Sequence, residues 1–228
     1  MLTFTAGCIC NSEALQTANP DNLLFSGQIL PEANGGLAGT PTAKFTQGDP
    51  FVAAVFNGLG SAGARAACFA AGAFRGTAAK LHTEQDLATL QKELHAELAA
   101  KAPEDTGISA LSISISRDRL SMANFGTCRA YLYRDQSLYL LSRKESSTAF
   151  LGNTALHDLR PYAISGTLHS KDQLLLCTDG LYRILDDPAI LRILATETTV
   201  AFALQSLLQH AKERGADDTV TAILLRFD

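Results

Sequence analysis

The chain has 228 residues, of which 46% are apolar and 18% are charged, and its formal net charge at neutral pH is -4. A chain of this length and apolar content can bury a large core, and we predict one domain over residues 1–228. The acidic balance and the lack of any run of Lys or Arg argue against nucleic-acid binding, because contact with phosphate backbones needs clustered positive charge.

The first residues, 1–8, lack the basic region of a signal peptide, and no apolar stretch approaches the roughly 20 residues that span a bilayer. Cys8 and Cys10 are predicted to be alternate residues of one strand, because no second Cys pair or nearby His completes a four-ligand zinc set. The five cysteines are an odd set in a chain too long to need disulfides. We therefore predict free thiols, a cytoplasmic location and no membrane partner.

Residues 27–50 contain several Gly and Pro and are predicted to form a loop. A buried strand from Phe51 then runs into a glycine-rich turn at 57–60, and an alanine-rich helix is predicted over 61–79. The next helix, 84–100, has Leu at steps of three and four residues. Thr83 is its expected N-cap, with Asp86 at the third helical position.

Strict alternation of apolar and hydroxyl residues predicts a strand at 111–116, which forms a hairpin with 120–125. A second hairpin is predicted from 129–134 and 137–141, so the strands are expected to form an antiparallel meander. Further strands are expected at 173–178 and 219–227.

Two helices are predicted late in the chain, at 188–195 and 198–214, the second closed by Gly215. Runs of strands separated by pairs of helices favour an α+β fold of antiparallel sheets covered by helices over a doubly wound parallel fold.

Three carboxylates lie at strand ends beside small or glycine-rich turns: Asp21, Asp179 and Asp218. Carboxylates gathered at one sheet edge would repel one another without a divalent cation between them, and Mg²⁺ and Mn²⁺ prefer oxygen ligands. The set therefore indicates a metal site. Because Asp before Gly is also common turn chemistry, a simple turn role is the alternative for each residue.

Five segments, taken in order, resemble motifs of the PPM (type 2C) metal-dependent protein phosphatases. They are Asn19-Pro-Asp-Asn, Phe56-Asn-Gly-Leu-Gly-Ser, Ala123-Asn-Phe-Gly-Thr-Cys-Arg-Ala, Leu174-Leu-Leu-Cys-Thr-Asp-Gly-Leu and Gly215-Ala-Asp-Asp-Thr-Val-Thr. The fourth is the most specific, since the family has Leu-Leu-Cys-Ser-Asp-Gly-Leu. The resemblance covers nearly the whole chain and implies a four-layer α-β-β-α sandwich, two antiparallel sheets flanked by helices.

The resemblance also implies a reaction. In this family two metal ions activate a water molecule that attacks the phosphorus of phosphoserine or phosphothreonine. Carried over by motif, the metal ligands are Asp21, Asp179, Asp218 and the carbonyl of Gly58. The implied cofactor is Mg²⁺ or Mn²⁺, as one or two ions, and the implied partner is a phosphoserine or phosphothreonine protein or its kinase.

The departures from the family pattern fall on the site. Asn57 stands where the family's bridging Asp would be, and its neutral amide points a donor toward a cation site. Pro20 replaces an acidic residue, and Gln16 stands where an Arg commonly grips phosphate, which removes a charge-assisted contact. Further differences are Thr127, residues 144–146 and Thr219.

Two hypotheses follow. The first is a weakened Mg²⁺- or Mn²⁺-dependent serine/threonine protein phosphatase, with one firmly bound ion and a doubtful second site. The alternative is a catalytically inactive pseudophosphatase that acts as a binding or regulatory module, because fold does not dictate function. A third interpretation, that Asn57 was introduced to trap an active enzyme, explains only one of the departures.

Overall fold

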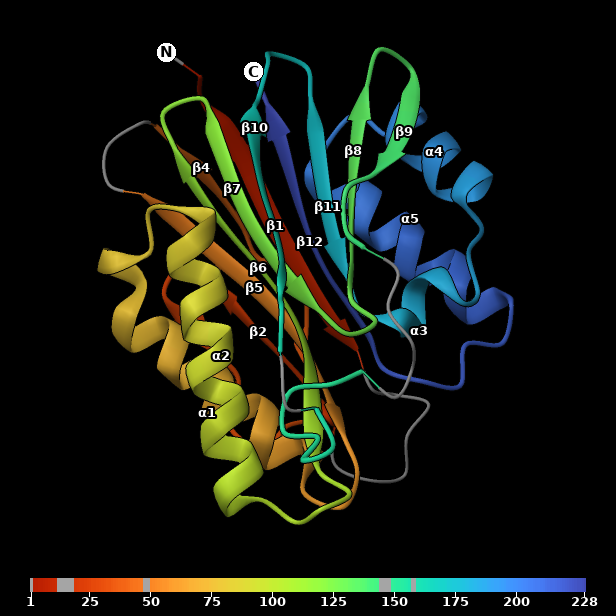
Figure 1. Cartoon of the computed structure of the whole chain (residues 1–228). Helices are drawn as coiled ribbons and strands as arrows, with labels where there is room; N and C mark the ends of the chain where they lie inside the picture. The colour runs from red at the N-terminus through yellow and green to blue at the C-terminus, as the bar shows by residue number, and fades with distance from the viewer. Residues whose placement is uncertain (1, 12–18, 47–49, 144–148, 157–158) are drawn as a thin grey trace.

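The chain folds into four layers, with two sheets packed face to face and helices on both outer faces (Figure 1). This computed structural model describes residues 2–11, 19–46, 50–143, 149–156 and 159–228. All strand pairs in both sheets are antiparallel. The predicted α+β sandwich is confirmed.

Each sheet has six strands. In spatial order, the first sheet contains β4 (Thr42–Phe45), β1 (Phe4–Asn11), β12 (Val220–Phe227), β11 (Gln173–Cys177), β8 (Arg129–Arg134) and β9 (Ser137–Leu140). The second contains β10 (Tyr162–Thr167), β7 (Arg119–Phe125), β6 (Gly107–Ser116), β5 (Phe51–Leu59), β2 (Asp21–Phe25) and β3 (Gln28–Ile29).

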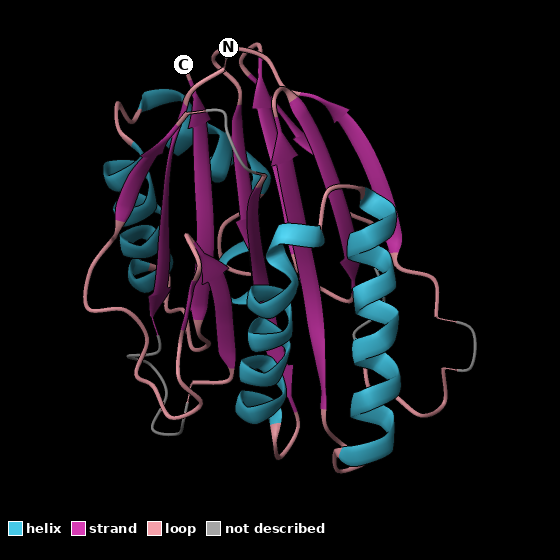
Figure 2. Ribbon diagram, turned by 90° about the vertical axis from the view of Figure 1, so that its left-hand side faces the viewer, coloured by secondary structure: helices cyan, strands magenta, loops and turns pink. Residues whose placement is uncertain are grey.

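The helices divide between the two outer faces. The second sheet is covered by α1 (Gly63–Thr77) and α2 (Glu84–Lys101), joined by the short 3₁₀ turn η1 (Ala78–Lys80), and Figure 2 shows these two helices lying across it. The first sheet is covered by α3 (Asp179–Tyr182), α4 (Asp187–Thr196) and α5 (Val200–Glu213).

Three apolar cores result from this layering. One fills the space between the sheets, and Cys8 and Cys10 contribute to it from the same face of β1, as alternation along a strand requires. The other two lie between each sheet and its helices. Cys177 of β11 is fully buried on the helix side. All five cysteines are free, as predicted.

Local signals for the helices are confirmed. Thr83 caps α2 and forms a capping box with Asp86, which satisfies backbone donors that the first turn leaves unpaired. Gly215, just after α5, adopts a φ of 82°, a conformation that glycine adopts without steric cost.

Two sequence-based predictions of strand arrangement are wrong. The hairpins β6–β7 and β8–β9 form as predicted but lie in different sheets, so they do not make a meander. The chain crosses between the sheets at Gly126, whose φ of 95° and close approach to Ser109 leave no room for a side chain. Residues 27–50 are not all loop, because they include the short strands β3 and β4 at sheet edges.

Candidate functional site

The predicted site residues converge where the two sheets meet, at the end of the sandwich that carries α3 (Figure 1). Asp21 opens β2 and lies directly opposite Asn57 of β5 in the strand register. Asp179 follows β11 as the first residue of α3, and Asp218 lies just before β12. One sheet therefore supplies Asp21 and Asn57, and the other supplies the two remaining carboxylates.

Asp21 is held in a buried polar network. Its side chain accepts a hydrogen bond from the hydroxyl of Thr178 at 2.8 Å, and its backbone N–H donates to the side chain of Asn19 at 2.9 Å. Only 3% of the residue is exposed. Burial raises the pKa of Asp21 well above its usual range, and the charges of Asp218 and Asp179 add to the rise.

Asp179 has a donor on each carboxylate oxygen. The side-chain amide of Asn57 donates to Oδ1 at 2.5 Å, and the guanidinium of Arg183 pairs with Oδ2 at 2.7 Å. Burial raises the pKa of Asp179, while Arg183 opposes the rise. The two contacts compensate this buried carboxylate from within the chain.

Gly58 follows Asn57 and must be a glycine. A Cβ at this position would lie 2.2 Å from the carbonyl oxygen of Gly63 and 2.4 Å from that of Pro20. The N–H of Gly58 also donates to the Pro20 carbonyl at 3.0 Å. The last residues of β5 are therefore packed against the segment that carries Asp21, which fixes the spacing between Asn57 and Asp21.

Asp218 lies beside the start of α3 and is half-buried. A Cβ on Gly180 would be 3.5 Å from the Cβ of Asp218, which places the two backbones in close approach. One carboxylate oxygen of Asp218 accepts the N–H of Thr219 at 2.7 Å. Gln16, the predicted phosphate-binding position, lies outside the described residues.

Protein donors face both carboxylate oxygens of Asp179. Within the described residues, no group of three or more His, Cys, Asp and Glu side chains is close enough together to hold a metal ion. Asn57 directs N–H donors, not a second carboxylate, at Asp179. A cation on Asp179 would have to displace the amide donor from Oδ1 or the guanidinium from Oδ2, and the positive charge of the guanidinium would repel it.

Sequence reasoning missed Arg183. The available signal was its spacing, because an Asp and an Arg four residues apart face each other on a helix. Sequence reasoning also assigned no role to Thr178. Its hydroxyl donates to Asp21 and accepts the N–H of Thr221 at 3.2 Å.

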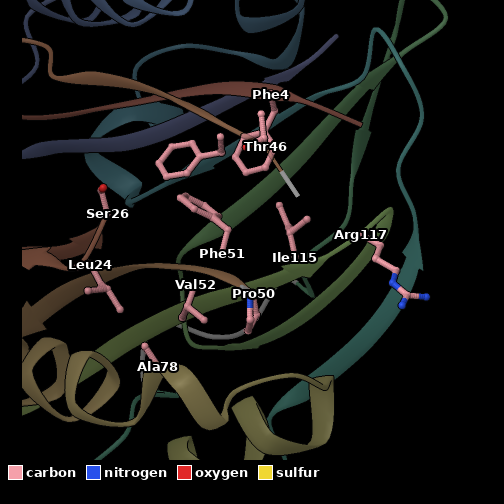
Figure 3. Close-up of a pocket in the computed structure, with 12 residues that line it drawn as sticks. Phe4, Leu24, Ser26, Thr46, Pro50, Phe51, Val52, Ala78, Ile115 and Arg117 are labelled. Carbon is pink, nitrogen blue, oxygen red and sulfur yellow. The ribbon is translucent and has the colours of Figure 1, made fainter. Parts of the chain in front are cut away.

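A cavity of about 490 Å³ opens at the opposite end of the sandwich (Figure 3). Its wall includes Phe4, Phe51 and Ile115, and among the described residues that line it only Arg117 is ionisable. Phe51 and Asn57 lie six residues apart on β5, a separation of about 20 Å along a strand. The cavity therefore does not belong to the carboxylate site.

No helix among the described residues is long and apolar enough to cross a membrane. The sequence profile described as Stage II sporulation protein E (SpoIIE) matches residues 53–228. No curated protein matches the sequence.

Several solved structures share the fold. The catalytic domain of the serine/threonine phosphatase PstP, solved with two manganese ions, superposes with a TM-score of 0.79 and 19% identity over 100% of this chain and 99% of that one. Stp1 of Staphylococcus aureus gives a TM-score of 0.79 and 18% identity over 98% and 94%. PppA of Pseudomonas aeruginosa gives 0.75 and 19% over 99% and 98%.

Proposed function

Because the chain belongs to the PPM/SpoIIE-type family of metal-dependent serine/threonine protein phosphatases, we propose that it is a pseudophosphatase, a binding or regulatory module for phosphoserine or phosphothreonine proteins or their kinases. The observation that carries the proposal is the contact between the Asn57 amide and Asp179 Oδ1. Asn57 occupies the position where the family has a metal-bridging carboxylate.

Three features of the site support the loss of turnover. Asn57 is neutral, so it cannot anchor a second ion as a carboxylate does. Pro20 offers only its backbone carbonyl, and that oxygen already accepts the N–H of Gly58. Arg183 neutralises Asp179 through a direct ion pair. The fold that recognises phosphoproteins in the family is kept, while the electrostatics that hold its ions are changed.

A second candidate function is slow metal-dependent hydrolysis with one ion. It is favoured by the convergence of Asp21, Asp179 and Asp218, since burial raises the pKa values of the first two and their negative charges reinforce one another. A single Mg²⁺ or Mn²⁺ held by these carboxylates and the carbonyl of Gly58 would relieve that repulsion and supply an activated water. It would have to displace Asn57 or Arg183 from Asp179.

The deciding experiment is hydrolysis of p-nitrophenyl phosphate and of a phosphothreonine peptide, with and without millimolar Mn²⁺. The chain is compared with Asn57→Asp, and Asp179→Ala controls for contaminating phosphatase. We expect the chain to match the Asp179→Ala background. Turnover above that background would establish a working phosphatase and refute the pseudophosphatase.

The Asn57→Asp variant separates two causes of inactivity. Turnover gained only in this variant would show that one missing carboxylate silences a competent scaffold. If it also stays at background, the changes at Pro20 and Gln16 contribute as well. The proposal further treats residues 1–228 as one domain and includes a cytoplasmic location, which the five free cysteines support.

A further inference from the structure

We propose that Arg183 is the fixed cation of this site, supplying from within the chain the positive charge that a metal ion supplies in the family. The inference deepens the proposed function and rests on it, because a chain that turned over with bound Mn²⁺ would have no need of such a charge. Its consequence is that the folded site is independent of divalent cations.

The position of Arg183 is set by the same turn that presents Asp179. The two residues are four apart, and the N–H of Arg183 donates to the Asp179 carbonyl at 3.0 Å. The guanidinium returns to the Asp179 carboxylate at 2.7 Å. Backbone and side chain thus join the same two residues, so the turn places the guanidinium within reach of the carboxylate.

Burial makes the pair more than a surface ion pair. The side chain of Asp179 is 6% exposed, while that of Arg183 is 58% exposed, so the carboxylate is desolvated and the guanidinium keeps most of its hydration. A buried carboxylate needs a compensating charge, and arginine supplies one that stays protonated at every physiological pH. The cost of this pair is therefore lower than that of two buried ions.

Asn57 completes the arrangement. Its amide donates to the Asp179 oxygen that Arg183 does not contact, and it lies opposite Asp21 in the register of β2 and β5. A carboxylate at this position would face Asp179 with a second negative charge that one guanidinium could not balance. Asn57 and Arg183 are thus complementary. Asn57 puts a neutral side chain where the family has a carboxylate, and Arg183 neutralises the carboxylate of Asp179.

The remaining acidic groups have protein donors of their own. Asp21 accepts the hydroxyl of Thr178, and Asp218 accepts the N–H of Thr219. Each carboxylate of the site therefore has at least one hydrogen bond that depends on no metal.

The test is thermal unfolding of the full chain in EDTA and in millimolar Mn²⁺, with Mn²⁺ as the only added ligand. The variants are Arg183→Gln, Arg183→Lys and Arg192→Gln. The last removes one positive charge from the exposed surface of α4 and is the matched control. Ligand binding to the native state raises Tm with ligand concentration, so Tm reports Mn²⁺ binding without any need for activity.

We expect the Tm in Mn²⁺ to equal the Tm in EDTA for the unmodified chain, for Arg192→Gln and for Arg183→Lys. Arg183→Gln is expected to unfold several degrees lower in EDTA and to recover that loss in Mn²⁺. If Arg183→Gln folds too poorly to measure, Arg183→Lys decides, because it keeps the charge and must stay insensitive to Mn²⁺. The proposal is overturned if Mn²⁺ raises the Tm of the unmodified chain or of Arg183→Lys, or if Arg183→Gln behaves as Arg192→Gln does.

The two proposals can fail separately. Stabilisation of the unmodified chain by Mn²⁺ without hydrolysis of p-nitrophenyl phosphate would refute the role of Arg183 and leave the pseudophosphatase intact. Mn²⁺-dependent hydrolysis would refute the pseudophosphatase directly, whatever the Tm values.

Discussion

Replacing Asn57 by Asp should destabilise the metal-free protein strongly at neutral and alkaline pH. The amide nitrogen of Asn57 lies 2.5 Å from Oδ1 of Asp179, so the new carboxylate would face an existing one at hydrogen-bond range. Both residues are buried, with 7% and 4% of their surface exposed. A favourable contact becomes a repulsive one without a change in side-chain volume.

The size of the effect follows from Coulomb's law. Two like charges about 4 Å apart at an effective dielectric constant of about 20 repel by about 4 kcal/mol. For a chain of this length, each kcal/mol lowers Tm by about 2–4 °C, so the expected loss is about 8–16 °C in EDTA at pH 8.

The pH dependence gives a sharper test than the magnitude. Repulsion raises the pKa of the carboxylate pair in the folded state, so between the unfolded and folded pKa values the native state binds more protons. Stability of the variant relative to the parent should therefore fall as pH rises from about 4, the ordinary Asp value, and level off above the folded pKa.

The assay is thermal unfolding followed by circular dichroism across pH 4–8 in EDTA. Asn57→Ala is the control, since it removes the same hydrogen bond and adds no charge, and its deficit should not grow with pH in the same way. Equal Tm values for Asn57→Asp and the parent at pH 8, or a deficit already complete at pH 4, would refute the electrostatic account of the site.

Four further substitutions test the scaffold, each by its Tm against the unmodified chain. Thr83→Ala removes the α2 capping box and should cost about 1 kcal/mol; no change would mean the cap is redundant. Phe56→Ala empties a fully buried position beside Phe74 and should cost about 3–5 kcal/mol; a cost under about 1 kcal/mol would contradict the packing. Arg134→Met removes the guanidinium that neutralises the buried Asp172 carboxylate, at a cost of about 3 kcal/mol, and adding Asp172→Asn should restore most of that. Gly58→Ala forces a Cβ against backbone oxygens, so loss of the cooperative transition is expected, and a normal transition would refute the close approach.

Periodicity and capping chemistry determined most elements from the sequence. The leucine spacing of α2, its Thr83 cap and the glycine after α5 are local signals that act within a few residues, and these elements formed as predicted. The strands β3 and β4 were not predicted, because short edge strands in a Gly- and Pro-containing segment carry little hydrophobic pattern.

The assignment of strands to sheets was decided only by the tertiary structure. The sequence shows two hairpins in succession, and nothing local distinguishes a continued meander from a crossing between sheets. The crossing depends on Gly126, in the connection between β7 and β8, packing against Ser109 of β6.

The site divides in the same way. The residue types and motifs of the sequence indicated Asp21, Asn57, Asp179 and Asp218, because these polar residues lie at or near the ends of apolar strands and match the motifs of one family in order. Only the folded structure could bring β5 and α3 close enough for the Asn57 amide to reach Asp179, residues 122 positions apart in the chain. Which groups neutralise a buried carboxylate depends on distances across layers, and no linear pattern contains those distances.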